Sequence, residues 1–141
     1  MKIEEVLPHR EPFLFVDDIL EQEYLKYAKG IKMVLDTEPW TKGHFPENPV
    51  FPGVLLLELM AQVGGFVFVN EAGSMKDNKF AYLTKVDNLR LKKKVIPGDI
   101  VEVTATFVDS FMNYSRVCAK SYVKNRMVAE AEITYTFMNS L

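Results

Sequence analysis

Two ionisable side chains of this sequence, His44 and Glu58, have the types and surroundings needed for acid–base chemistry. The unperturbed pKa of an imidazole is about 6.5, so His44 suits proton abstraction at neutral pH. Glu58 lies in the otherwise apolar run LLLELMA, where an ionised carboxylate costs several kcal/mol unless it is paired or its pKa is raised. Each also has an ordinary alternative, because loop histidines are often only packed and such carboxylates can reach solvent or accept a structural hydrogen bond.

Two further positions can assist such a pair. Gly53 begins a predicted helix, whose first amides lack partners and carry about half a positive charge, so its N–H can hold a developing oxyanion. Gln62, four residues after Glu58, shares a helix face with it and can hold water or orient a polar group, or can make a helix-to-sheet hydrogen bond. A base, an acid and an oxyanion donor can remove the hydrogen beside a thioester carbonyl and expel a hydroxyl from the next carbon. This chemistry requires no metal or organic cofactor.

Two consecutive segments must position these groups. Residues 36–51 contain Pro39, Pro46, Pro49 and Gly43, which exclude regular structure and predict a loop ordered by side-chain packing. The run from Pro52-Gly53 to about Glu71 then predicts a helix that is apolar on nearly every side. Such a helix must be enclosed.

The remaining elements are predicted to be strands that enclose it. In the segment 99–109, Val101, Val103, Ala105 and Phe107 alternate with polar residues, the pattern of a sheet with one buried face. Because there is one long apolar helix to cover that face, we expect an α+β fold with a curved antiparallel sheet wrapped around the helix, as a single domain over residues 1–141. The predicted strands are residues 13–18, 24–35, 79–94, 99–109, 113–124 and 127–138.

Composition excludes several classes of function. The 141 residues are 48% hydrophobic, enough for a substantial core, and the net charge of −2 gives no basic field for nucleic acid. The single Cys118, interpreted as a small strand hydrophobe, leaves no zinc cluster with the two histidines, and His9 is interpreted as structural. The N-terminus lacks signal-peptide character and the apolar run 54–69 is interrupted by polar residues, so we expect a cytoplasmic protein without a membrane span.

The run Gly43–Gln62, GHFPENPVFPGVLLLELMAQ, closely resembles the signature of FabZ-type (3R)-hydroxyacyl-[acyl carrier protein] dehydratases. The segments Leu7–Leu14, Val86–Leu91 and Pro97–Asp99 are similar to that family's flanking motifs. The resemblance implies a hot-dog fold, a dimer in which the two sheets run together, and commonly a hexamer built as a trimer of dimers. It also implies that His44 of one subunit meets Glu58 of its partner.

The resemblance further implies roles in dehydrating (3R)-3-hydroxyacyl-[acyl carrier protein] to the trans-2-enoyl product in type II fatty acid biosynthesis. His44 is expected to be the base, Glu58 to protonate the departing hydroxyl, the Gly53 amide to hold the thioester carbonyl, and the Val50 carbonyl to orient the imidazole. Isomerase activity is not expected, because the related bifunctional enzyme carries aspartate where this chain has Glu58. The residues expected to line or orient the acyl tunnel are Gln62, Tyr82, which gates it in some relatives, Phe51, Met60 and Phe66.

Two features leave the substrate and its docking open. Many relatives carry smaller or less acidic residues in place of Phe51 and Glu47-Asn48, so chain length or partner can differ. A local basic cluster can dock an acidic carrier protein or can be only a solvated face, and it consists of Lys85, Arg90, Lys92, Lys93 and Lys94. A hot-dog acyl thioesterase and a non-catalytic acyl-chain sensor or carrier-binding module remain alternative functions.

Overall fold

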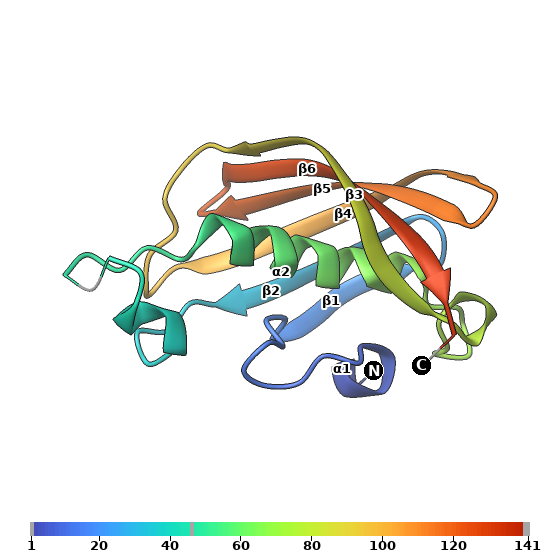
Figure 1. Ribbon diagram of the computed structural model, residues 1–141, viewed down its shortest axis with the longest axis horizontal. Coiled ribbons are helices and arrows are strands. Elements are labelled where there is room, and N and C mark those ends of the chain that lie inside the picture. The colour runs from blue at the N-terminus through green and yellow to red at the C-terminus, as the bar shows by residue number, and fades with distance from the viewer. Residues whose placement is uncertain (1, 46, 140–141) are drawn as a thin grey trace.

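A computed structural model describes residues 2–45 and 47–139 of the chain, so Pro46 of the loop motif lies outside the described residues (Figure 1). One long helix, α2 (Gly53–Gly65), lies against a six-stranded antiparallel sheet. The strands are β1 (Asp18–Glu23), β2 (Tyr27–Met33), β3 (Phe80–Leu91), β4 (Ile100–Phe111), β5 (Tyr114–Val123) and β6 (Arg126–Met138). The short helices are α1 (Ile3–Val6) and the 3₁₀ turns η1 (Pro39–Lys42), η2 (Phe66–Phe68) and η3 (Lys76–Asn78).

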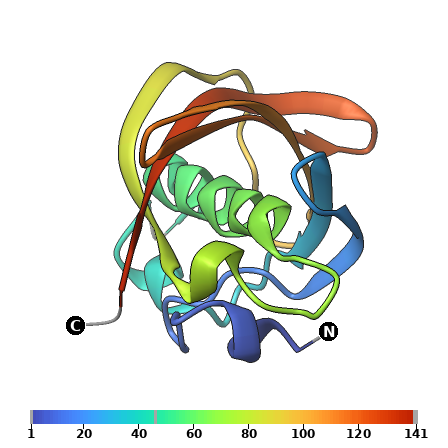
Figure 2. The same ribbon diagram turned by 90° about the vertical axis from the view of Figure 1, so that its right-hand side faces the viewer.

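The strands are ordered β1-β2-β4-β5-β6-β3, and the sheet curls around α2 when the molecule is viewed along the helix (Figure 2). In β4, Val101, Val103 and Ala105 are buried while their sequence neighbours are more exposed, and Phe107 packs against the core. The predicted alternation is therefore confirmed. The predicted α+β architecture, a curved antiparallel sheet around one apolar helix in the manner of a hot-dog fold, is also confirmed.

Small residues allow α2 to lie close to the sheet. A Cβ at Gly64 would stand 2.3 Å from the hydroxyl oxygen of Tyr135 on β6, so any side chain here would force Tyr135 to move. That hydroxyl donates a 2.6 Å hydrogen bond to the carbonyl of Ala61 one turn earlier. Helix and sheet are thus locked together one turn beyond Glu58, which fixes the direction of this part of the helix.

One predicted strand was misplaced and one predicted helix end was wrong, and the strand predicted over residues 13–18 overlaps the observed β1 only at Asp18. Residues 13–17 form no strand in the sheet, because the backbone of Phe13 and Phe15 bonds to the side chain of Gln62 on α2 instead of to a neighbouring strand. The helix predicted to reach about Glu71 ends at Gly65, where two consecutive glycines weaken it and the chain tightens into η2. No helix in the described ranges is both long and apolar enough to cross a membrane.

The loop before α2 is ordered by a buried ion pair. Lys32 of β2 is only 5% exposed, and its ammonium lies 2.8 Å from one carboxylate oxygen of Glu38. The other oxygen accepts the Leu35 amide at 2.6 Å, and the Glu38 carbonyl accepts the Thr41 hydroxyl. These bonds anchor η1, which leads directly to His44.

Candidate active site

His44 is held at the end of the loop by two hydrogen bonds. Its amide donates to the Trp40 carbonyl at 3.0 Å, and its Nδ1 lies 2.7 Å from the Val50 carbonyl oxygen. Because a carbonyl oxygen only accepts, Nδ1 carries a hydrogen, and in the neutral ring the lone pair is therefore on Nε2. The half-buried ring therefore has the tautomer and orientation that a base requires, through the expected Val50 contact.

Glu58 lies on α2 with its side chain 23% exposed. Burial raises the pKa of Glu58 above its ordinary value, and the hydrogen bond from Gln62 opposes this effect. A carboxyl group whose proton is retained at higher pH is suited to donate it to a leaving group. The raised pKa of Glu58 agrees with the expectation from its position inside the apolar run.

Gln62 holds that carboxyl in place and is itself 1% exposed. Its Oε1 accepts the Phe15 amide at 2.9 Å, while its Nε2 donates to the Phe13 carbonyl at 2.8 Å and to Glu58 Oε2 at 3.2 Å. Because the Phe15 amide can bond only to the oxygen, the amide orientation of Gln62 is fixed. Gln62 therefore orients the Glu58 carboxyl, one of the two alternatives left open by the sequence. The other alternative, a helix-to-sheet hydrogen bond, is not what the described residues show, because Gln62 bonds to Phe13 and Phe15, which lie outside the sheet.

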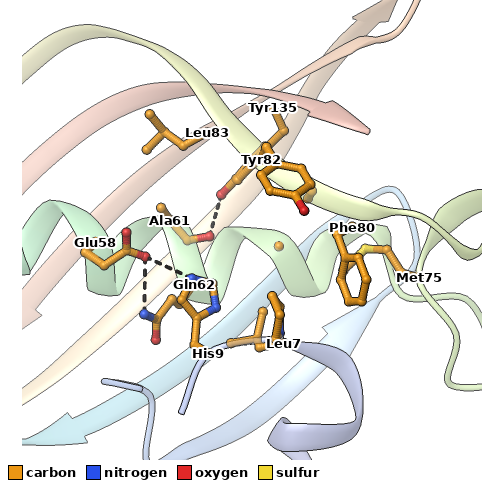
Figure 3. Close-up of a pocket in the computed structure, with 13 residues that line it drawn as sticks. Leu7, His9, Glu58, Ala61, Gln62, Met75, Phe80, Tyr82, Leu83 and Tyr135 are labelled. Carbon is orange, nitrogen blue, oxygen red and sulfur yellow. Dashed lines mark hydrogen bonds and ion pairs between the residues drawn. The ribbon is translucent and has the colours of Figure 1, made fainter. Parts of the chain in front are cut away.

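Glu58 and Gln62 line a cavity of about 220 Å³ whose walls are mainly apolar (Figure 3). The predicted tunnel residue Tyr82 and its neighbour Leu83 line the cavity from β3, and Tyr135 lines it from β6. Burial, followed by the negative charge of Glu58, raises the pKa of Tyr135, so this hydroxyl stays neutral. The cavity offers an apolar space beside a carboxyl group.

His9 also lines this cavity, contrary to its interpretation as a structural residue without a carboxylate nearby. Its Nε2 lies 3.7 Å from Glu58 Oε2 (Figure 3). The sequence contained one signal of this placement, because His9 lies in the Leu7–Leu14 segment that resembles a family motif and is one of two histidines. Nothing in the local pattern showed that the segment would fold against α2.

Gly53 and Val50 belong to a different hollow. Gly53 begins α2, no side chain caps this end of the helix, and a Cβ at Gly53 would lie 2.4 Å from Leu91 Cδ1. The groove of about 280 Å³ around Gly53 is also lined by Phe51 and by three residues of the predicted docking cluster, Lys92, Lys93 and Lys94. The oxyanion donor proposed from the sequence thus lies beside positive charge.

Two predicted tunnel residues lie elsewhere. Met60 and Phe66 are fully buried in the core and line neither the Glu58 cavity nor the Gly53 groove. Lys85 and Arg90, the other members of the basic cluster, lie exposed on β3, and Lys85 is 3.5 Å from Asp87. The cluster therefore extends from the Gly53 groove along the edge of the sheet.

Within one chain, His44 and Glu58 are not brought together by any bond. The described residues contain no hydrogen bond or ion pair between them, and the Glu58 cavity and the Gly53 groove share no lining residue. Gly53 and Glu58, five residues apart, face directions about 140° apart around an α-helix. The Glu58 cavity and the Gly53 groove are therefore separate hollows of the chain.

A curved antiparallel sheet around one central helix defines a hot-dog fold, and this one carries Glu58 on the helix and His44 in the loop before it. Residues 7–132 match the family described as FabA-like domain. The 3-hydroxyacyl-[acyl-carrier-protein] dehydratase FabZ of Syntrophotalea carbinolica is 42% identical over 137 residues, which cover 97% of this chain and 92% of that protein. The chain belongs to the FabZ dehydratase family within this group, as its motifs predicted.

Other comparisons agree with this assignment. The FabZ dehydratase of Actinobacillus pleuropneumoniae serotype 5b is 40% identical over 132 residues, 94% of this chain and 86% of that protein. Among solved structures, the dehydratase heterocomplex ApeI:P from Xenorhabdus doucetiae superposes with a TM-score of 0.81 at 12% identity, covering 99% of this chain and 93% of that chain. At that identity the likeness concerns the fold alone. The prediction of a dehydratase is confirmed by the curated relatives.

Proposed function

We propose that this protein removes water from (3R)-3-hydroxyacyl chains carried on acyl carrier protein and forms the trans-2-enoyl thioester. The observation that carries the proposal is a complementary pair of groups, an imidazole whose Nε2 is free and a carboxyl whose pKa is raised. The names of the curated relatives supply the substrate class. The pathway that we propose is type II fatty acid biosynthesis.

The proposed reaction proceeds without a change in oxidation state. His44 Nε2 takes a proton from C2 of the acyl chain, and the released electron pair forms the C2–C3 double bond. The C3–O bond breaks, and Glu58 transfers its proton to the departing oxygen, which leaves as water. The Gly53 amide holds the negative charge that develops on the thioester oxygen.

The proposed active unit is a dimer in which His44 meets Glu58 of the partner subunit. β3 is an edge strand of 12 residues, and Leu83, Leu89 and Leu91 on it are each at least 40% exposed. A long edge strand with unpaired backbone groups and exposed apolar side chains is a template for pairing with another chain. Pairing of two β3 edges would join the two sheets and place His44 of each subunit near Glu58 of the partner subunit. A trimer of such dimers stays a prediction.

Proximity supports docking of an acidic carrier protein at the basic cluster. Lys92, Lys93 and Lys94 line the same groove as Gly53, where the thioester must be bound. Lys92 lies 3.8 Å from Glu130, whereas Lys93 and Lys94 make no ion pair within the described residues. Positive charge at this position can steer a carrier so that its acyl thioester enters beside the helix end.

Turnover of 3-hydroxybutyryl thioester tests the reaction. His44→Ala and Glu58→Gln should each lower kcat by about 10²- to 10⁴-fold, because proton transfer by a positioned group contributes that much. Glu102→Gln, which neutralises an exposed carboxylate on β4, is the matched control and should keep wild-type rates. Retained turnover in both site variants would overturn the proposal, and release of free thiol from a saturated acyl thioester would indicate a thioesterase instead.

Carrier docking requires a separate measurement. The double variant Lys93→Ala/Lys94→Ala should raise KM for carrier-bound substrate but not for a short thioester without carrier, and should weaken the dependence of KM on salt. Lys120→Ala/Lys124→Ala, at exposed positions on β5 and in the turn that follows it, removes the same two charges away from the groove. Equal effects on both substrates would contradict docking at the cluster.

A further inference from the structure

His9 is placed beside the acid by interactions that involve its whole segment. The Arg10 guanidinium donates hydrogen bonds to the carbonyls of Leu7 at 2.9 Å, His9 at 2.7 Å and Glu4 at 3.1 Å, which fixes the backbone that follows α1. The His9 ring stacks on Phe13 with centroids 6.2 Å apart and an interplanar angle of 20°. The Phe13 carbonyl in turn accepts Gln62, so the ring is tied to the helix that carries Glu58.

The surroundings of His9 favour a neutral ring. Burial, followed by the charge of Arg10, lowers the pKa of His9 below its ordinary value. Its Nδ1 is buried and has no hydrogen-bond partner within the described structure. An imidazolium would leave an N–H there without an acceptor, so the single hydrogen of the neutral ring belongs on Nε2.

That Nε2 hydrogen faces Glu58 Oε2, the same oxygen that accepts Gln62 (Figure 3). Glu58 Oε1 has no hydrogen bond within the described residues and points away from His9 and Gln62 (Figure 3). The other titratable side chains that line the cavity are Tyr82 and Tyr135. The Tyr135 hydroxyl donates to the Ala61 carbonyl, so its proton is directed away from the carboxyl.

We propose that His9 is a positioning residue that, together with Gln62, directs two N–H donors to Glu58 Oε2 and thereby leaves the transferable proton on Oε1, facing the cavity. The inference deepens the proposed function, since it concerns the same acid. A proton on Oε2 would have to displace at least one of the two donors, whereas a proton on Oε1 displaces none. At 3.7 Å the His9 N–H lies close enough for its dipole to favour negative charge on Glu58 Oε2 in the free protein.

Two substitutions separate this role from packing and from proton relay. His9→Phe keeps a ring against Phe13 but removes the donor, whereas His9→Gln places an amide N–H near the position of Nε2 and cannot titrate near neutral pH. We expect His9→Phe to lower kcat about tenfold with little change in KM, the effect of losing one hydrogen bond to a charged group. We expect His9→Gln to recover kcat to within about threefold of the wild type.

A titration of Glu58 provides a readout that does not depend on turnover. In protein labelled with ¹³C at glutamate side-chain carboxyls, the Glu58 signal is assigned by its loss in Glu58→Gln. Removal of a donor to the ionised form should move this titration to higher pH in His9→Phe and restore it in His9→Gln. If the wild type shows no dehydration, the proposed function fails, while the carboxyl titration still tests the placement of His9.

Three results would overturn the role of His9. One is a Glu58 titration that is unchanged in His9→Phe. Another is a His9→Gln variant as impaired in kcat as His9→Phe, which would mean that a titrating imidazole is required. The third is a rise in KM alone in both variants, which would place His9 in substrate binding.

Discussion

Subunit mixing tests most directly whether each active site takes its base and its acid from different copies of the chain. His44→Ala and Glu58→Gln are each expected to be inactive alone. If His44 of one subunit meets Glu58 of its partner, a mixed dimer of the two variants contains one site with both groups replaced and one with both intact. Two defective proteins should therefore restore activity when they share a dimer.

The size of the expected recovery follows from how the two variants distribute between dimers. Random exchange between equal amounts of the two variants gives about half mixed dimers, and each of these has one working site of two. The mixture should therefore reach about one quarter of wild-type activity per subunit. If the base and the acid of a site came from the same chain, no mixed dimer would contain an intact site and no activity would return.

The assay follows hydration of a crotonyl thioester after the two variants are refolded together, with mixed dimers quantified by native mass spectrometry. A parallel mixture of His44→Ala with the control Glu102→Gln should give about one half of wild-type activity, because half of all sites then contain an intact pair. Verified mixed dimers that stay at the activity of the separate variants would refute the arrangement. Recovery proportional to the mixed fraction would support it.

Three other predictions concern stability. Burial raises the folded-state pKa of Glu58 above its ordinary value near 4.5. The protonated carboxyl therefore stabilises the fold below that pH, and this contribution is lost as the pH rises through the raised pKa. The Tm of the wild type should fall over this interval, and Glu58→Gln should flatten that fall. Gly64→Ala would place a Cβ 2.3 Å from the Tyr135 hydroxyl and should cost about 1–3 kcal/mol in urea unfolding; a wild-type midpoint would contradict this packing. Lys32→Met removes the 2.8 Å partner of the Glu38 carboxylate, whose side chain is only 15% exposed, and should lower the free energy of unfolding by about 3–5 kcal/mol. The double variant Lys32→Met/Glu38→Gln should recover part of this loss. Equal unfolding free energies for the single and double variants would argue against the ion pair.

The sequence determined much of the architecture because its local patterns were strong. The alternation through Val101, Val103 and Ala105 identified a strand with one buried face, and the apolar run after Gly53 identified the enclosed helix. Both signals are periodicities that a short window can hold, so they do not depend on the rest of the chain. The boundaries were less secure, because the end of α2 at Gly65 and the start of β1 at Asp18 depend on competing partners.

The acid was also recognisable from sequence, since a carboxylate among leucines requires an explanation wherever it occurs. The surroundings of Glu58 were not recognisable. His9 reaches it because the segment after α1 bonds through Phe13 and Phe15 to Gln62, a contact across 47 and 49 residues. No local pattern encodes such a pairing, because it depends on the whole sheet having curled around the helix.

The separation of the Glu58 cavity from the Gly53 groove was likewise decided by tertiary structure. The motif places His44 and Glu58 only 14 positions apart, and spacing alone cannot say whether they meet. The helix that begins at Gly53 turns Glu58 toward one cavity, while the loop bonds His44 to Val50 on the other side. The sequence thus determined which groups are present and what chemistry they suit, and the folded chain decided which way they face, because direction depends on backbone geometry and long-range packing.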